Sequence, residues 1–156
     1  MIKFIGDQKE RKRISRDILQ SLPEWFGIRE STEEYIETSA GLPFWAAYAE
    51  GEPAGFLAMK ETGPVTAEIF VMAVRREYQR FGFGRALWQE CLKYAREHGY
   101  QYIQVKTVKR GCYEIYDKTN DFYQALGFQE LECFPELWDQ WNPCQVYVQY
   151  LSLIHI

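Results

Sequence analysis

The sequence has no long apolar segment: none of its hydrophobic runs approaches the roughly 20 residues that a helix needs to cross a bilayer. Residues 1–6, MIKFIG, also lack the apolar stretch and cleavage signal of a secretory leader. We therefore expect a cytoplasmic protein without a membrane partner.

An excess of basic residues is missing as well. The 18 lysines and arginines are outnumbered by 22 aspartates and glutamates, which gives a net charge of -4. Because nucleic acid attracts cationic surfaces, this balance argues against nucleic acid as the main partner. An acidic surface is better suited to a cationic ligand.

Metal-binding and disulfide patterns are also lacking. The four cysteines, Cys91, Cys112, Cys133 and Cys144, form no Cys-x-x-Cys pair, and the chain has only two histidines. Zinc sites are commonly built from closely spaced cysteines and histidines. We therefore expect no metal, and no disulfide framework where no secretory signal is found.

What the chain has is the composition of a globular enzyme. Of its 156 residues, 47% are hydrophobic, 26% charged and 17% aromatic. That is enough apolar material for a core and too much for a disordered chain. We find no repeat, linker or low-complexity segment, and we expect one domain over residues 1–156.

The N-terminal half predicts a strand, two helices and three antiparallel strands. Residues 2–5 form the first strand, and Asp7-Gln8-Lys9-Glu10 is a capping box that begins a helix ending at Pro23. Ser31-Thr32-Glu33-Glu34 predicts a second capping box and a helix that ends near Gly41. Apolar runs on both sides of a Gly/Pro turn then predict a hairpin over residues 43–60, followed by a strand at 65–74.

The C-terminal half predicts strands and helices in alternation. A helix ends at Gly99 and is followed by a strand over residues 101–107, so the two strands flanking the helix should form a parallel pair. A helix at 113–126 and a strand at 128–133 come next. Residues 134–144 predict a long aromatic loop, and 145–151 a last strand, which the tail 152–156 either extends or follows as a non-native addition. These elements predict a mixed α+β fold.

The centre of the chain predicts an anion site. A strand at residues 67–74 leads through Gln79-Arg80-Phe81-Gly82-Phe83-Gly84 into an amphipathic helix. Its apolar positions are Leu87, Cys91, Leu92, Ala95 and His98. The first turn of a helix has free N–H groups, and the helix dipole favours negative charge there. Gly82 and Gly84 lack side chains that would keep a phosphate from this backbone, so we predict a phosphate-bearing ligand.

Two common phosphate motifs do not fit. A P-loop requires Gly-Lys-Ser/Thr, whereas Gly84 is followed by Arg85-Ala86. A dinucleotide fingerprint requires a third glycine, and Leu87 stands in its place. Both are excluded.

The pattern Gln/Arg-x-x-Gly-x-Gly/Ala does fit residues 79–84. At these residues the chain resembles the GNAT superfamily of N-acetyltransferases, which bind the pyrophosphate of acetyl-CoA with this loop. Ala67-Glu68-Ile69 resembles the family's strand with a catalytic glutamate, and Val74 precedes Gly84 by the family's spacing of ten residues. Phe122-Tyr123-Gln124-Ala125-Leu126-Gly127-Phe128 is similar to the family's Phe-Tyr-x-x-x-Gly-Phe.

The resemblance covers most of residues 2–151 and implies a fold and an activity. The fold is a GNAT-like, mostly antiparallel mixed sheet of six or seven strands with a parallel central pair, flanked by about four helices. The activity is transfer of an acetyl group from acetyl-CoA directly to a primary amine in a ternary complex. The acceptor is a small-molecule or peptide amine: small amines, aminoglycoside-like antibiotics, amino acids and protein N-termini or lysines all remain open.

Two residues are the catalytic candidates. Glu68 is the candidate general base, acting directly or through water, because an alkylamine is mostly protonated at neutral pH. Strand alternation places it on the face of Phe70, Met72 and Val74, beside apolar neighbours. The alternative for Glu68 is a carboxylate near a strand end that reaches solvent. Tyr123 is the candidate general acid for the leaving thiolate, and its alternative is a tyrosine packed in the core.

The resemblance also implies a set of cofactor-binding residues. Backbone N–H groups around Val74 would polarise the acetyl carbonyl. Tyr116 is a reserve acid two helical turns before Tyr123, and Thr119 supplies a hydroxyl or caps the helix. These two residues stand where the family often has Asn and Ala. The complete set is Met72, Ala73, Val74, Gln79, Arg80, Phe81, Gly82, Phe83, Gly84, Arg85, Tyr116 and Thr119.

The remaining hypotheses concern the wall of the acceptor site and two alternative functions. We expect the wall to come from Trp25, Phe26, Trp45 and residues 134–141, all of which fit a core or a homodimer contact equally well. One alternative function is a regulatory module that binds CoA without turnover. The other is an interaction protein that uses the tryptophans of residues 134–141 as a contact surface.

Overall fold

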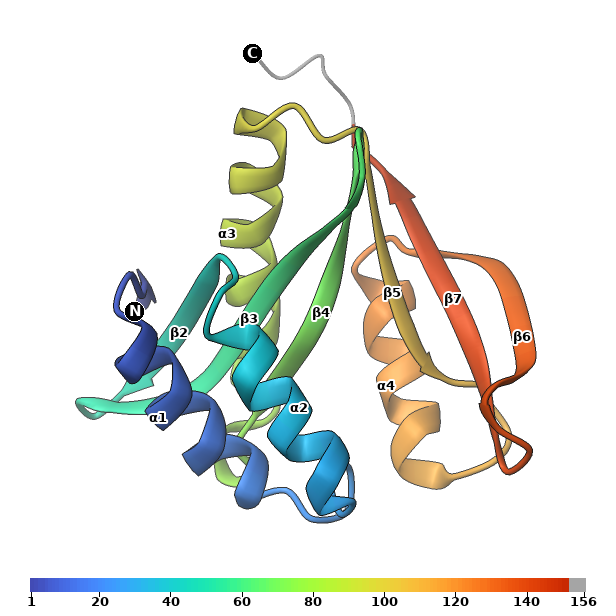
Figure 1. The fold of residues 1–156 in the computed structure, drawn as a ribbon, viewed down its shortest axis with the longest axis horizontal. Helices are drawn as coiled ribbons and strands as arrows, with labels where there is room; N and C mark the ends of the chain where they lie inside the picture. Colours follow the sequence, from blue (N-terminus) through green and yellow to red (C-terminus); the bar gives the residue numbers. More distant parts are fainter. Residues whose placement is uncertain (152–156) are drawn as a thin grey trace.

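The computed structural model of this protein describes residues 1–151. Within them, seven strands form one sheet in the order β1-β2-β3-β4-β5-β7-β6, and β4–β5 is its parallel pair (Figure 1). The strands are β1 (Ile2–Phe4), β2 (Phe44–Ala49), β3 (Glu52–Gly63), β4 (Thr66–Val74), β5 (Tyr102–Val108), β6 (Gln129–Asp139) and β7 (Asn142–Tyr150). The predicted mixed α+β fold with a central parallel pair is confirmed. The predicted extension by 152–156 lies outside the described residues.

Helices cover both faces of the sheet. They are α1 (Gln8–Gln20), α2 (Arg29–Ser39), α3 (Phe83–Glu97) and α4 (Glu114–Ala125), with a 3-10 turn η1 (Arg76–Tyr78) before α3. Helices α1 and α2 pack on one face over β2 to β4, and α3 and α4 lie on the other (Figure 1). No helix within residues 1–151 is long and apolar enough to cross a membrane.

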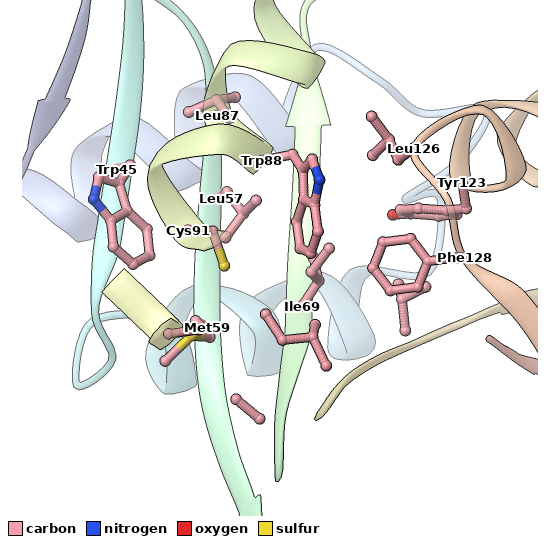
Figure 2. Packing of buried hydrophobic residues seen from close by; sticks show 14 of the residues in the cluster. Trp45, Leu57, Met59, Ile69, Leu87, Trp88, Cys91, Tyr123, Leu126 and Phe128 are labelled. Atoms are coloured by element: carbon pink, nitrogen blue, oxygen red, sulfur yellow. The ribbon is translucent and has the colours of Figure 1, made fainter. Parts of the chain in front are cut away.

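The core under α3 is rich in aromatic side chains. Trp88 is buried and its ring lies 5.0 Å from that of Phe128 (Figure 2). Of the apolar face predicted for this helix, Leu87, Cys91 and Ala95 are buried, whereas His98 is exposed and stacks on a tyrosine one turn earlier. Burial raises the pKa of Cys91 to about 12, which suits a packing role for this thiol.

β4 contains a bulge that reverses its faces. Ala58 of β3 pairs with Val71 and Met59 pairs with Ile69, so Phe70 is an extra residue. Ile69 therefore packs on the α3 side, while Val71 packs on the α1–α2 side. The predicted regular alternation from Glu68 to Val74 is wrong for this reason, and the glutamate lies on the face opposite to Met72 and Val74.

β4 and β5 separate soon after they meet. Their ladder holds three pairs and ends at Glu68 and Gln104, although β5 stays paired with β7 as far as Val108. Figure 1 shows the two strands diverging from that end of the sheet. Among the described residues, the facing edges of 69–74 and 105–108 consequently have no strand partner.

Two predicted boundaries are wrong. Helix α2 begins at Arg29, so the predicted capping box lies inside it, and the Thr32 hydroxyl donates to the carbonyls of Phe26 and Ile28 at 3.0 Å. The predicted aromatic loop 134–144 is mostly the β6–β7 hairpin. An Asp139 oxygen accepts the N–H groups of residues 141 and 142, which forms the turn. Pro135 is tolerated because β6 is an edge strand.

A buried amide joins α4 to the sheet, and its loss should destabilise the fold. Asn120 donates to the Val108 carbonyl at 2.9 Å and accepts from the Tyr147 hydroxyl at 2.5 Å. We expect Asn120→Ala to lower the free energy of unfolding by about 2–3 kcal/mol, because both partners stay buried without a bond. Asn142→Ala, in the exposed hairpin turn, should cost less than about 1 kcal/mol. Urea unfolding compares the two, and equal losses would contradict this role of Asn120.

Candidate active site

A cavity of about 1060 Å³ opens where β4 and β5 separate. Its walls are the two strand edges at 69–74 and 105–108, one side of α4, the start of α2 and the segment that joins α1 to α2. The loop before α3 also reaches it, through Gln79 and Arg80. The cavity thus connects the predicted phosphate loop with the centre of the sheet.

The start of α3 has a backbone geometry that suits an anion. Gly82 is its N-cap with φ 86°, a left-handed conformation, and no side chain caps the first turn. Arg80 is also left-handed, with φ 73°. Alternation of left- and right-handed residues points successive N–H groups into a concavity that suits anions. The N–H groups of the first turn of α3 have no partner in the helix and add to this site.

Two of the predicted loop residues also make contacts within the chain. A Cβ on Gly84 would lie 2.9 Å from the Cζ of Phe122, so this glycine lets α3 pack closely on α4. The Gln79 amide donates to the carbonyl of Val74 at 3.0 Å and thereby ties the loop to the end of β4. Both positions are explained by packing and hydrogen bonding within the chain.

Most predicted cofactor residues line the cavity. Those that do are Met72, Ala73, Val74, Gln79, Arg80, Phe83, Gly84, Tyr116 and Thr119. Phe81, which is 72% exposed, and its neighbours Gly82 and Arg85 lie outside the lining. The Thr119 hydroxyl donates to the Ile115 carbonyl one turn earlier, so it does not cap the helix.

Glu68 is buried and paired with a lysine. It is 7% exposed, and its Oε1 lies 3.3 Å from the Nζ of Lys106 on β5. Lys106 lines the cavity, whereas Glu68 does not. The alternative of a carboxylate that reaches solvent is therefore wrong, and the predicted apolar surroundings of Glu68 also contain a charged partner. No sequence motif indicated Lys106; it is simply the next residue on the face of Gln104 in an alternating strand.

Tyr123 faces the cavity from α4. It is 6% exposed and packs edge-on against Phe128 (Figure 2). It packs in the same way against Phe122. Burial raises the pKa of Tyr123 well above its usual value, so the phenol keeps its proton at neutral pH. Within residues 1–151 no group bonds to its hydroxyl, which leaves that proton available to a ligand.

Two other tyrosines of the cavity hold its walls together. The Tyr116 hydroxyl donates to the Trp25 carbonyl at 3.3 Å, which joins α4 to the segment between α1 and α2, and burial raises the pKa of Tyr116. Tyr35 of α2, which sequence reasoning missed, packs edge-on against Phe26 and Phe70, and burial raises its pKa too. Tyr35 belongs to no motif, so only the fold reveals its place.

Three of the residues predicted for the acceptor wall border the cavity. Trp25, Phe26 and Trp138 line the cavity. Trp45 is only 4% exposed and packs between Phe4 and Tyr94 on the α3 side of β2. Its prediction as acceptor wall is wrong, because β2 lies two strands away from the β4–β5 separation.

Comparison with known proteins shows which family has this architecture. The family model described as acetyltransferase (GNAT) family matches residues 12–128, which is more than half of the chain. The chain belongs to the GNAT family. The N-acetyltransferase YvbK of Bacillus subtilis (strain 168), itself uncharacterised, is 28% identical to this GNAT protein over 101 residues, 65% of this chain and 60% of YvbK. The chain thus spans about three fifths of the length of the curated relatives that it matches.

Solved structures share the fold of this GNAT protein. One from Desulfovibrio desulfuricans, assigned to the GNAT family, has a TM-score of 0.82 and 19% identity, covering 97% of this chain and 100% of that one. An aminoglycoside 6'-N-acetyltransferase complexed with coenzyme A has a TM-score of 0.75 and 17% identity, covering 97% of each chain. At these identities the likeness concerns the fold alone.

The ion pair at the cavity wall predicts a stability cost for Lys106→Met. The substitution leaves the buried Glu68 carboxylate unpaired, so we expect a loss of about 1–3 kcal/mol, reduced from the fully buried case because the lysine side chain is 34% exposed. Lys12→Met removes the exposed pair with Glu37 and should cost about 0–1 kcal/mol. Thermal unfolding distinguishes the two. Adding Glu68→Gln to Lys106→Met should restore part of the loss; a double variant that only adds the two costs would argue against the pair.

Proposed function

We propose that this GNAT protein is an acetyl-CoA-dependent N-acetyltransferase that transfers the acetyl group directly to a primary amine in a ternary complex. One observation carries the proposal: a single cavity joins an uncapped helix N-terminus to the unpaired edge of β4. The helix end suits a pyrophosphate, and the strand edge suits an extended ligand with amide groups. The structural likeness to a protein complexed with coenzyme A supports this choice of ligand.

The residues present fit acetyl-CoA. The loop of Gln79 to Gly84 would hold its pyrophosphate with backbone N–H groups, and the cavity-lining guanidinium of Arg80 would add positive charge. The backbone of Met72 to Val74 would bond to the pantetheine arm along the open edge of β4. A volume of about 1060 Å³ is at the upper end of ordinary ligand pockets, so it leaves room for an acceptor.

Acetyl-CoA would supply the activated acyl group, and the chain would supply proton transfer and orientation. A backbone N–H near Val74 would donate to the acetyl carbonyl oxygen and stabilise its negative charge. Tyr123 would donate its phenolic proton to the leaving sulfur. Glu68 would take the proton of the incoming amine, either through a water or after Lys106 moves aside.

The acceptor end of the cavity favours a cationic amine. Trp25, Phe26 and Trp138 give it aromatic surface, and Glu34 and Asp139 give it carboxylates. Aromatic faces and carboxylates both attract an ammonium group. A small-molecule or peptide amine that carries positive charge fits this end.

A second candidate function is a module that binds coenzyme A without turnover. The observation that favours it is the position of Glu68, which is paired and set back from the cavity. Release of thiol from acetyl-CoA in the presence of an amine panel decides between the two, because the module would bind coenzyme A and release nothing.

The phosphate site is tested by two matched glycines. Gly82 and Gly99 flank α3 with φ of 86° and 81°, and an added Cβ would meet nothing within 4 Å at either. Each alanine variant should therefore lose about 1–2 kcal/mol of stability through backbone strain. Only Gly82→Ala should weaken coenzyme A binding, by about tenfold, because it displaces the first N–H groups of the helix. Calorimetry measures both affinities, and equal affinities would place the pyrophosphate elsewhere.

The proton-transfer roles are tested by turnover. Glu68→Gln and Tyr123→Phe should each lower kcat about 100-fold while coenzyme A still binds, because each removes one proton-transfer group. Glu61→Gln changes an exposed glutamate of β3 that bonds to Tyr100, and it should leave the rate unchanged. Rates of thiol release with a saturating amine give the comparison. Wild-type rates in both site variants would remove the assignments.

A further inference from the structure

We propose that Lys106 is itself an acetylation site: its side-chain amine accepts an acetyl group from acetyl-CoA within the cavity, and the modification breaks the ion pair with Glu68. The proposal rests on the proposed function, since the same cavity must bind acetyl-CoA. It concerns a residue of the chain as substrate, in addition to any external amine.

The backbone places Lys106 where the two strands separate. Gln104 forms the last pair with Glu68, and Lys106 is the next residue of β5 on the same face. Its side chain is 34% exposed and lines the cavity, and its Nζ lies 3.3 Å from Oε1 of Glu68. A primary amine, a carboxylate that can take its proton and the cavity for the acyl donor are therefore adjacent.

Two other lysines each have half of this arrangement. Lys60 is the backbone register partner of Glu68 across β3 and β4, but among the described residues it forms no ion pair with it. It is exposed, lies outside the cavity lining and places its Nζ 5.6 Å from the ring centroid of Phe70. Lys118 lines the cavity from α4 but has no carboxylate partner within the described residues. Lys106 combines both properties.

The chemistry balances without a further reagent. The Lys106 ammonium gives one proton to Glu68, and the neutral nitrogen then forms a bond to the acetyl carbonyl carbon while the carbon–sulfur bond breaks. The nitrogen loses its second proton to solvent, and the sulfur gains a proton from Tyr123, which recovers it from solvent. Glu68 returns its proton to solvent. The products are Nε-acetylated Lys106 and free coenzyme A.

The modification changes the charge next to Glu68. An amide is neutral, so acetylated Lys106 no longer balances the buried carboxylate. Glu68 then becomes the partner for the ammonium of an external amine. This exchange would turn a carboxylate that is blocked in the unmodified chain into a base that an acceptor can reach.

The test is incubation of the protein with acetyl-CoA in the absence of any amine. We expect the intact mass to rise by one acetyl group per chain, one equivalent of thiol to be released, and peptide mapping to place the group on Lys106. Lys60 and Lys118 in the same digest are the matched controls, and the protein unfolded in urea gives the chemical background. Glu68→Gln should slow the modification at least tenfold, and Lys106→Arg should abolish it.

The outcomes separate this proposal from the proposed function. Turnover of an external amine with Lys106 unmodified overturns the proposal and leaves the function standing. Modification of Lys106 no faster than that of Lys60 and Lys118 also overturns it, as chemical background. If neither turnover nor modification occurs, both the proposed function and the modification of Lys106 are wrong. A thermal shift with coenzyme A then shows whether the protein still binds this ligand. The same thermal shift verifies that the Glu68→Gln variant is folded. Slower modification of Lys106 in the Tyr123→Phe variant would be a second result in support of the proposal.

Discussion

The separation of β4 from β5 is the constraint on which the rest of the site depends. A parallel pair in the middle of a sheet would normally bond along its whole length, yet here the ladder ends after three pairs. Backbone groups at 69–74 and 105–108 then need other partners, because unpaired buried N–H and carbonyl groups are costly. Asn120 supplies one, at the Val108 carbonyl, and Gln79 another, at that of Val74. The cavity lies along both strand edges, so a ligand there can bond to remaining backbone groups.

Because of the bulge at Phe70, the site residues of β4 lie on both faces of the strand. Before the bulge, Glu68 points to the α1–α2 side, where it meets Lys106. After it, Met72 and Val74 point to the α3–α4 side and pack against the core that includes Tyr123. The extra residue also bends the strand, which accounts for its departure from β5 just at this point. A regular strand would have kept these residues on one face and the ladder intact.

Most of the fold could be predicted from the sequence because local residue patterns determine its helices, strands and turns. Apolar periodicity, turns and the glycines around Gly82 located most elements, and the loop from Gln79 to Gly84 together with the Phe122-Tyr123 motif indicated the family. Prediction from the sequence failed where contacts between distant segments determine the structure. The segment from Glu68 to Val74 contains no glycine or proline to mark a bulge, so its faces were assigned wrongly. Trp45 was placed in the site because composition cannot tell which strand neighbours the cavity.

The pairing of Glu68 with Lys106 could not be predicted from the sequence either, because it joins strands whose register is known only from the fold. Such a pair contributes little net stability, since removing both charges from water costs about as much as their attraction returns. Well-packed apolar side chains at both positions would hold β4 to β5 at least as well. A buried carboxylate paired with an amine that lines a ligand cavity is therefore better explained, under the proposed function, by proton transfer than by stability. Under the proposed function, proton transfer would take place where the strands separate, and Lys106 would be as relevant to it as Glu68.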